Sequence, residues 1–367
     1  MFKRASIAGA LLAAACAGEP TEPGADLARG GRPTSAIAGV ALLDHRSLRC
    51  DDSSAEAVTA GTVTTITGSC RRNGVTLPFV WTSGSGAAVL DGQPGGMGGT
   101  AASDDGTTFG SAGPGAYYRP PNGAVMELPL PAGMVWGNVL DATPSGTLAI
   151  GSVSDEAGMS FQALGWRWSG ETWTTEELPG GAAVSGDGNV LVGVSANRAS
   201  VWTRSGASWV HLTLPDGGAI RSRATGINRA GTMISGVRTV QSSNDPAEEY
   251  EEPVVWVASG SVGWALEPLT GLFASAEGEA LAVETLTDGR TAAVGWLWED
   301  LAGGTEQLWA VAWIRPHGTG AFAAPLKLAP LAKGRYAWAH DVNPRGEVVG
   351  SSLAKGLSGA AILWQLP

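Results

Sequence analysis

The sequence predicts an all-β fold: a seven-bladed β-propeller with about four antiparallel strands per blade, closed by an N-terminal strand. Three observations predict it. A short turn motif returns along the chain, a second glycine follows each copy, and a strand carrying an aromatic residue follows each glycine. Units of about 40 residues with four short strands each are typical of propeller blades.

The clearest unit spans residues 224–236, Ala-Thr-Gly-Ile-Asn-Arg-Ala-Gly-Thr-Met-Ile-Ser-Gly. Asn228 suits the first position of a type I turn, and Gly231 accepts a positive φ without steric cost. The pattern predicts two strands joined by a turn with a glycine bulge. The same turn recurs at 103–106, 143–146, 185–188 and 343–346, with weaker copies around Gly61 and Gly289.

Each unit has a second glycine in its second predicted strand. The series is Gly68, Gly110, Gly151, Gly193, Gly236, Gly295 and Gly350. The spacing is 41 to 43 residues across the first five and 59 and 55 residues after that. The aromatic residues of the third strands are Trp81, Tyr118, Trp168, Trp202, Trp256, Trp313 and Trp364. Six or eight blades, or an open β-solenoid, are the alternative architectures.

The two ends of the repeat region complement each other. The last unit ends at 364–367 after three predicted strands, and a strand-like run at 36–43 precedes the first unit. We expect this run to complete the last blade, because ring closure leaves only short, protected strand edges.

The repeat resembles the HAF-type extracellular repeat family. Residues 224–231 (Ala-Thr-Gly-Ile-Asn-Arg-Ala-Gly) and 339–346 (Ala-His-Asp-Val-Asn-Pro-Arg-Gly) carry the resemblance, which extends over about residues 50 to 367. It implies a secreted or surface-held repeat protein. It implies no catalytic residues.

The N-terminal residues predict export. Residues 1–15 combine a basic start with a short apolar run, as in a signal peptide. The following Cys16 resembles the lipidated cysteine of bacterial lipoproteins, and an ordinary signal peptide is the alternative. Residues 16–35 then form a flexible, lipid-anchored linker, and 36–367 the propeller. We expect an outer membrane lipoprotein or an extracellular protein, held at the membrane only by its lipid.

Cys50 and Cys70 are the two cysteines of the repeat region. An even number in an exported chain favours a disulfide, with two unpaired thiols as the alternative. The formal net charge of −11 argues against nucleic-acid binding. We expect a monomer that binds an unknown protein or glycan at the cell surface.

The fifth and sixth units contain insertions that we interpret as loops between the second and third strands. Their acidic residues are Glu248, Glu249 and Glu251 in the fifth unit and Glu299 and Asp300 in the sixth. Two such loops on one face would form an acidic patch, although solvated surface insertions are the simpler explanation. Trp296, Trp298, Trp309 and Trp313 would share one face of a hairpin, either as cross-strand pairs or as a platform for a sugar or peptide.

Motifs for catalysis, metal binding or cofactor binding are absent from the sequence. It has no nucleophile elbow, no His-Glu-x-x-His, no Cys-x-x-Cys, no phosphate-binding loop and no EF-hand. We therefore predict no catalytic residue, no metal and no cofactor. The function this favours is a non-enzymatic binding scaffold. The alternatives are a propeller hydrolase or lyase, with ionisable residues from several blades meeting at the central channel, and a structural envelope protein.

Overall fold

The computed structural model describes residues 37, 39–41, 49–90, 98–158, 160–242, 248–260, 263–271, 277–301, 305–317, 320–331, 334–353 and 359–367. The chain divides into two units, Met1–Thr34 and Ser35–Pro367, and all described residues belong to the second. The predicted signal peptide (1–15), Cys16 and the linker (16–35) lie outside the described residues. None of the described segments is a helix long and apolar enough to cross a membrane.

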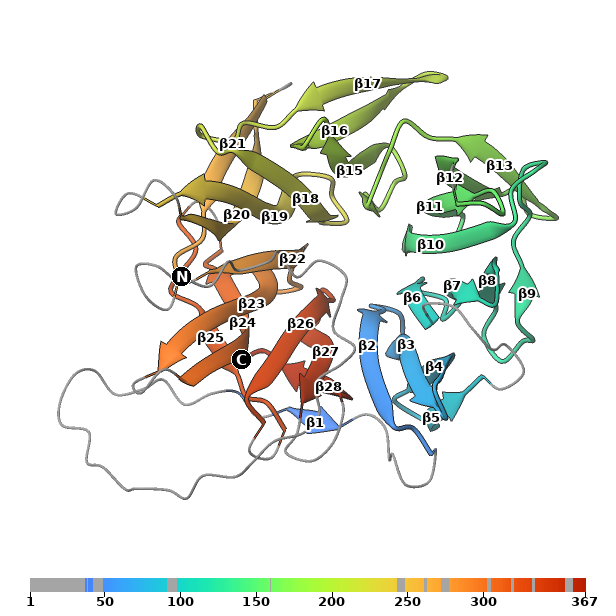
Figure 1. The fold of residues 1–367 in the computed structure, drawn as a ribbon, viewed down its shortest axis with the longest axis horizontal. Coiled ribbons are helices and arrows are strands. Elements are labelled where there is room, and N and C mark those ends of the chain that lie inside the picture. Colours follow the sequence, from blue (N-terminus) through green and yellow to red (C-terminus); the bar gives the residue numbers. More distant parts are fainter. Residues whose placement is uncertain are drawn as a thin grey trace. The chain divides into compact units, whose positions relative to one another are not determined.

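The described residues form β-strands and no helix. Within residues 35–367 the sheets follow one another around a common centre and, where it is labelled, the first strand of each four-stranded unit lies nearest to that centre (Figure 1). Five sheets have four antiparallel strands each, paired in chain order. Their strands are β2 (Asp52–Val58), β3 (Thr65–Arg72), β4 (Val75–Thr82) and β5 (Gly86–Val89); β6 (Gly98–Ala102), β7 (Thr108–Ala112), β8 (Gly115–Arg119) and β9 (Met126–Glu127); β10 (Trp136–Ala142), β11 (Leu148–Ser154), β12 (Phe161–Trp168) and β13 (Trp173–Glu177); β14 (Ala183–Val184), β15 (Val190–Ser195), β16 (Arg198–Ser205) and β17 (Ser208–Thr213); β18 (Arg221–Ile227), β19 (Met233–Gln241), β20 (Glu249–Ser259) and β21 (Gly263–Pro268).

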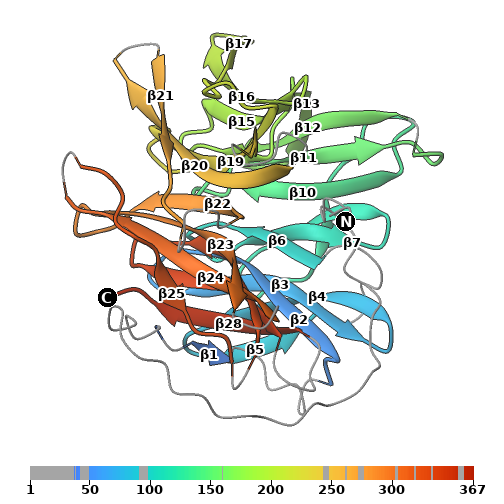
Figure 2. The ribbon, with the colours of Figure 1, turned by 60° about the vertical axis from the view of Figure 1, so that its left-hand side comes forward.

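The remaining strands form one eight-stranded sheet made of two four-stranded groups. The groups are β22 (Gly278–Thr285), β23 (Thr291–Leu301), β24 (Thr305–Arg315) and β25 (Leu326–Leu328), then β26 (Tyr336–Val342), β27 (Glu347–Leu353), β28 (Gly359–Gln365) and β1 (Val40–Ala41). A single parallel pair, Leu308 with Tyr336, joins the groups. β1 lies beside β28 and pairs with it in antiparallel fashion (Figure 2). The all-β prediction and the four-stranded antiparallel unit are confirmed, while the sheets of the described residues number six.

The repeated turn lies between the first and second strands of its unit. In six units a glycine with φ between 67° and 88° ends the turn, and its N–H donates to the carbonyl three residues earlier at 2.8–2.9 Å. These glycines are Gly106, Gly146, Gly188, Gly231, Gly289 and Gly346. Around Gly61 the chain turns without this positive φ.

The second glycine of each unit has a steric reason. In six units the first strand contains a β-bulge opposite this glycine, as between Val139 and Asp141 opposite Gly151. The bulge brings a first-strand carbonyl so close that a Cβ on the glycine would lie 1.9–2.1 Å from its oxygen. Gly193 is the exception. Its sheet has a short, regular first strand, and the nearest atom to a Cβ there lies 3.2 Å away.

A buried tryptophan two residues beyond the partner of that glycine connects successive sheets. Each of four such indoles donates its Nε1–H to a backbone carbonyl in the segment that ends the preceding unit, at 2.6–2.9 Å. The pairs are Trp166 to Pro129, Trp256 to Pro215, Trp313 to Thr270 and Trp364 to Ala329. Trp168, the aromatic residue expected near the end of the third strand of the third unit, is the last residue of β12 but lies one alternation beyond the equivalent position. Pairing of Gly151 with Leu164 makes Trp166 the equivalent of Trp256.

The hydrophobic core lies between successive sheets. One cluster joins the first unit to the last through Ala55, Phe79, Val349 and Ala361. The other clusters join neighbouring units in chain order. Cys50 and Cys70 form a disulfide with Cα atoms 5.5 Å apart, next to the first of these clusters.

Candidate functional site

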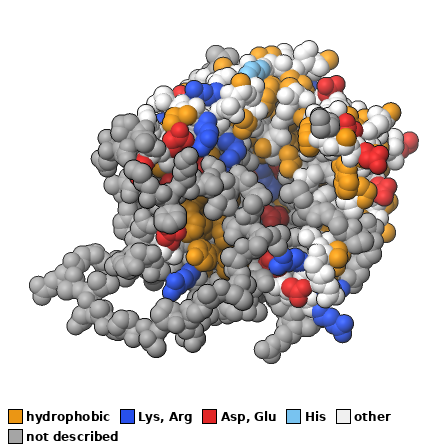
Figure 3. Space-filling model, in the orientation of Figure 1, with side chains coloured by type: hydrophobic (Ala, Val, Ile, Leu, Met, Phe, Trp, Pro, Cys, Tyr) orange, Lys and Arg blue, Asp and Glu red, His pale blue; other side chains and the backbone are white. Residues whose placement is uncertain are grey.

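The turns that follow the first strands contact one another across unit boundaries. A backbone N–H in one turn donates to a backbone carbonyl in the next turn at 2.7–2.9 Å. The pairs are Asp104 to Pro144, Gly186 to Arg229 and Thr287 to Pro344. Polar side chains from turns far apart in sequence therefore meet. Figure 3 draws one face of the molecule, and acidic and basic side chains lie close together near its middle.

Arg229 holds this meeting point together. It belongs to the β18–β19 turn, and its guanidinium donates to both carboxylate oxygens of Asp104, in the β6–β7 turn, with one contact of 2.8 Å. Its Nε lies 3.5 Å from a carboxylate oxygen of Glu284, on β22. Arg229, in the fifth unit, therefore joins carboxylates from the second and sixth units.

Three carboxylates occupy one repeat position, two residues before the first residue of the turn. They are Asp141, Glu284 and Asp341, where the other units have Ala57, Ala101, Ala183 and Gly226. We call Asp104, Asp141, Arg229, Glu284 and Asp341 the turn cluster.

Each of the three accepts two backbone N–H groups. One belongs to the next residue of its own strand. The other belongs to a neighbouring unit: Val184 at 2.8 Å for Asp141, Val58 at 2.9 Å for Asp341, and Arg229 at 3.4 Å for Glu284. The carboxylates thus connect one unit to another.

Burial makes these carboxyls unusually weak acids. Together with a smaller contribution from the negative charge of Asp341, it raises the pKa of Asp141 to about 7 and that of Glu284 to about 7. Burial also raises the pKa of Asp341 to about 6. Backbone N–H groups and Arg229 oppose the shift without cancelling it. In Asp104, by contrast, the hydrogen bonds and charge of Arg229 outweigh burial and lower the pKa. Near neutral pH the cluster therefore combines one ionised carboxylate with carboxyls that exchange protons.

A Glu–His pair lies at the bulges beside the cluster. Glu56 and His340 occupy the bulge positions of the first and last units, with Nδ1 of His340 3.1 Å from Glu56 and 3.0 Å from the Ala55 carbonyl oxygen. Burial favours the neutral imidazole, but the Glu56 carboxylate outweighs it and raises the pKa of His340. Thr100 and Thr225 take the same position in other units and donate to the neighbouring strand. His340 therefore keeps a structural contact and adds a proton-exchanging group.

The tryptophans predicted as a platform do not share one face. Pairing of Leu297 with Trp309 and of Trp298 with Leu308 places Trp309 on one face of the hairpin and Trp296 and Trp298 on the other. Trp309 donates its indole N–H to Glu299, and Lys327 binds Glu299 at 2.8 Å while lying 4.4 Å from the centre of the Trp309 ring. The prediction that the four tryptophans share one face was wrong. The register between the two strands decides which residues lie on the same face, and the spacing within one strand does not reveal that register.

The predicted acidic loops are extensions of strands. Glu249 and Glu251 lie in β20, paired with Gln241 and Thr239, and Glu299 and Asp300 lie in β23. Glu249 forms an ion pair with Arg221 at 3.5 Å, and Glu248 is exposed. The side chain of Asp300 and residues 243–247 lie outside the described residues. Strand pairing and ion pairs thus account for Glu249, Glu251 and Glu299.

The sequence prediction missed the turn cluster. The sequence did contain a sign of the cluster. The position two residues before the turn is Asp or Glu in three of the seven units and Ala or Gly in the other four. Asp104 lies in the predicted turn 103–106, and nothing near Asp104 or His340 in the sequence indicates a partner, because their partners lie 125 and 284 residues away along the chain. Among the described residues, no group of three or more His, Cys, Asp or Glu side chains is placed to hold a metal ion.

Known structures resemble the fold. No family model matches the chain, and no curated protein matches it. The β-propeller domain of the Trilobed protease from Pyrococcus furiosus is 8% identical with a TM-score of 0.54, over 86% of this chain and 94% of that one. An acylaminoacyl peptidase from Pyrococcus horikoshii is 8% identical with a TM-score of 0.52, over 86% of this chain. The match spans 52%, about half, of that peptidase. At this identity the likeness concerns the β-propeller fold alone.

Proposed function

We propose that the protein is a seven-bladed, closed β-propeller that acts as a hydrolase or lyase by acid–base catalysis at the turn cluster. Seven four-stranded groups support the blade number, because among the named strands one parallel pair, Leu308 with Tyr336, joins the two groups of the eight-stranded sheet, beside an isolated bridge between Ile37 and Leu328. Contacts between the first and last units support closure: Val58 N–H donates to Asp341, and Asn343 donates to the Thr59 carbonyl at 2.6 Å.

One observation carries the enzymatic proposal: carboxyls from the third, sixth and seventh units converge around Arg229 with pKa values of about 6 to 7. General acid–base catalysis is most effective when the pKa of the group lies near the working pH. Perturbed pKa values are also enriched at functional sites. A non-enzymatic scaffold is the weaker proposal, because its premise was that no ionisable residues converge.

The residues have distinct roles. Asp141 and Glu284 exchange the proton with the substrate, since their pKa of about 7 supports both acid and base forms at neutral pH. Arg229 stabilises negative charge that develops on the substrate. Asp104 is a positioning residue, because it fixes the Arg229 guanidinium. His340 and Glu56 form a second proton-exchanging pair next to the cluster.

A substrate panel tests this proposal. The purified protein is assayed with chromogenic esters, glycosides and aminoacyl anilides, and with polysaccharides for the conjugated double bond that an elimination leaves. We expect turnover of one class, and a loss of about 100-fold or more in kcat for Asp141→Asn and Glu284→Gln. Glu177→Gln, an exposed acid on β13, is the matched control. Absence of turnover, or turnover unchanged in both variants, would contradict the proposal.

We also propose that the protein works in an oxidising compartment outside the cytoplasm, as a monomer. The Cys50–Cys70 disulfide supports this compartment, because such bonds persist where thiols are not kept reduced. The resemblance to HAF-type repeats points the same way. Non-reducing mass spectrometry of the protein from its native source checks the compartment, and two free thiols there would contradict it.

A further inference from the structure

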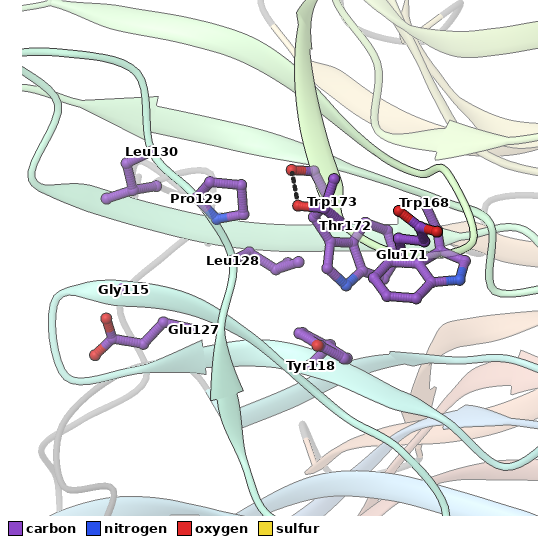
Figure 4. Close-up of a pocket in the computed structure, with 10 residues that line it drawn as sticks. All are labelled: Gly115, Tyr118, Glu127, Leu128, Pro129, Leu130, Trp168, Glu171, Thr172 and Trp173. Atoms are coloured by element: carbon purple, nitrogen blue, oxygen red, sulfur yellow. Dashed lines mark hydrogen bonds between the residues drawn. The ribbon is translucent and has the colours of Figure 1, made fainter.

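A pocket of about 580 Å³ lies between the outer strands of the second and third sheets and contains none of the turn-cluster residues in its lining (Figure 4). Tyr118 on β8, Glu127 on β9 and the segment 128–130 form one side. Trp168 on β12, Glu171 in the hairpin and Trp173 on β13 form the other. Its volume is within the range of pockets that bind small molecules.

Three aromatic rings in the lining of the pocket pack against one another. The Trp173 ring centre lies 5.2 Å from that of Tyr118 and 5.4 Å from that of Trp168, with the planes tilted by 58° and 49°. Phe109, fully buried, meets Trp173 edge-on at 6.0 Å. The rings are therefore fixed by packing, at an angle to one another rather than face to face.

The charge of the pocket has a single sign. Glu127 and Glu171 belong to its lining, and none of its ten lining residues is Lys or Arg. Aromatic faces carry negative potential and attract cations. Rings and carboxylates together favour a cationic ligand and disfavour an anionic one.

The repeat itself provides a comparison. In the fourth unit Arg204 pairs with Trp209 across the outer strands, and its guanidinium carbon lies 5.3 Å from the centre of the Trp209 ring. In the third unit the equivalent pair is Trp168 with Trp173. In the fourth unit the Arg204 guanidinium therefore covers the Trp209 ring. In the third unit a second ring, that of Trp168, takes the place of this cation, and a pocket lies beside the rings.

We propose that this pocket binds a trimethylammonium group, as in choline or a phosphatidylcholine headgroup. A quaternary ammonium gains from several ring faces at once and loses little hydration on entering, because it has no N–H donor. The two glutamates add attraction without requiring a directional hydrogen bond. This site is independent of the catalytic role proposed for the turn cluster.

Isothermal titration of the protein with choline, and with its neutral isostere 3,3-dimethylbutan-1-ol, tests the proposal. The two ligands have the same shape and differ in charge. We expect choline to bind at least about tenfold more tightly than the neutral alcohol. Sedimentation with phosphatidylcholine or phosphatidylglycerol vesicles separates the sources: binding only to phosphatidylcholine vesicles, without binding of free choline, identifies the lipid headgroup.

Variants locate the site. Trp168→Phe and Trp168→Leu preserve an apolar side chain while reducing and then removing the ring, so choline affinity should fall in that order. Glu171→Gln should weaken binding about threefold, because it removes one exposed charge. Trp209→Leu is the control, because Arg204 already covers that ring. Equal affinity for choline and the neutral alcohol, no binding of either choline or vesicles, or unchanged choline binding in folded Trp168→Leu, would overturn the proposal.

Discussion

The carboxyl groups of the turn cluster and those of the aromatic pocket differ in their surroundings. In the cluster, Asp141, Glu284 and Asp341 each accept backbone N–H groups of their own and a neighbouring unit, and Arg229 joins three units. In the pocket, Glu127 and Glu171 are exposed at the rim of packed rings. Changes in the cluster should therefore alter stability and function together. Changes at the pocket rim should alter binding alone.

The largest effect should come from the bulge that shapes the first strands and places the cluster. Gly151→Ala puts a Cβ 1.9 Å from the Asn138 carbonyl oxygen, whereas Gly193→Ala in the unbulged fourth unit meets nothing closer than 3.2 Å. We expect a loss of about 3 to 4 kcal/mol in the free energy of unfolding for the first and less than about 1 kcal/mol for the second. Urea unfolding of both variants measures the difference, and equal losses would contradict the steric explanation.

The disulfide should contribute the next largest effect. Replacing Cys50 and Cys70 together by Ala opens a loop with a sequence separation of 20. The chain-entropy model gives a loss of about 3 kcal/mol. The double variant compared with the reduced native protein separates the crosslink from the side chains. A loss below about 1 kcal/mol would show that packing of the first unit against the last suffices.

The cluster should make stability depend on pH. The folded pKa of Asp141, about 7, lies above its ordinary value of 3.8, so between about pH 4 and 7 the folded state keeps a proton that the unfolded state has lost. Stability from this group therefore falls as pH rises through that window. The negative charge of Asp341 raises the pKa of Asp141, and the positive charge of Arg229 lowers it.

Asp141→Asn isolates this dependence. It should cost about 1 kcal/mol near pH 4, because Asn cannot accept both backbone N–H groups. Because Asn does not titrate, it should also flatten the decline between about pH 4 and 7 by about 2 kcal/mol, which is below the full conversion of the shift because the side chain is partly exposed. Urea unfolding at several pH values provides the measurement, with Asp187→Asn as the control. A slope identical to that of the native protein would exclude the raised pKa.

A smaller effect is expected for the tryptophans that connect the sheets. Trp256→Phe retains a ring but loses the N–H that donates to the Pro215 carbonyl at 2.6 Å. We expect about 1 to 2 kcal/mol of destabilisation, from the unpaired carbonyl and the lost volume. The exposed Glu171→Gln should stay within about 0.5 kcal/mol of the native protein in the same thermal unfolding experiment. A greater loss for Glu171→Gln than for Trp256→Phe would break the distinction between the two regions.

Local patterns made the fold predictable. Gly106, Gly231 and Gly346 punctuate the chain because one backbone conformation at the turn requires them, and Gly151 follows because the bulge leaves no room for a Cβ. Such requirements act over a few residues, so they are visible in the sequence. The sequence does not reveal the bulge itself, but it does show the repeated glycine that the bulge requires.

The features that could not be predicted from the sequence depend on contacts between segments that are distant along the chain. Trp166 and Trp168 both fit the aromatic pattern, and only pairing with β11 distinguishes them. The register of β23 with β24 likewise decided that Trp309 faces away from Trp298. The Arg229–Asp104 pair joins turns 125 residues apart and follows no spacing rule. The cluster therefore appeared only with the arrangement of the sheets.

The most direct test of the central claim is a pH titration of the cluster carboxyls by NMR. Protein labelled with ¹³C at the Asp and Glu carboxyls, with Asp141→Asn and Glu284→Gln to assign the two signals, reports the protonation of each group. The structure predicts titration midpoints near 7 for both residues. Midpoints near 4, the ordinary range of carboxyl groups, would mean that the cluster holds only fixed charges and would contradict its role in proton exchange.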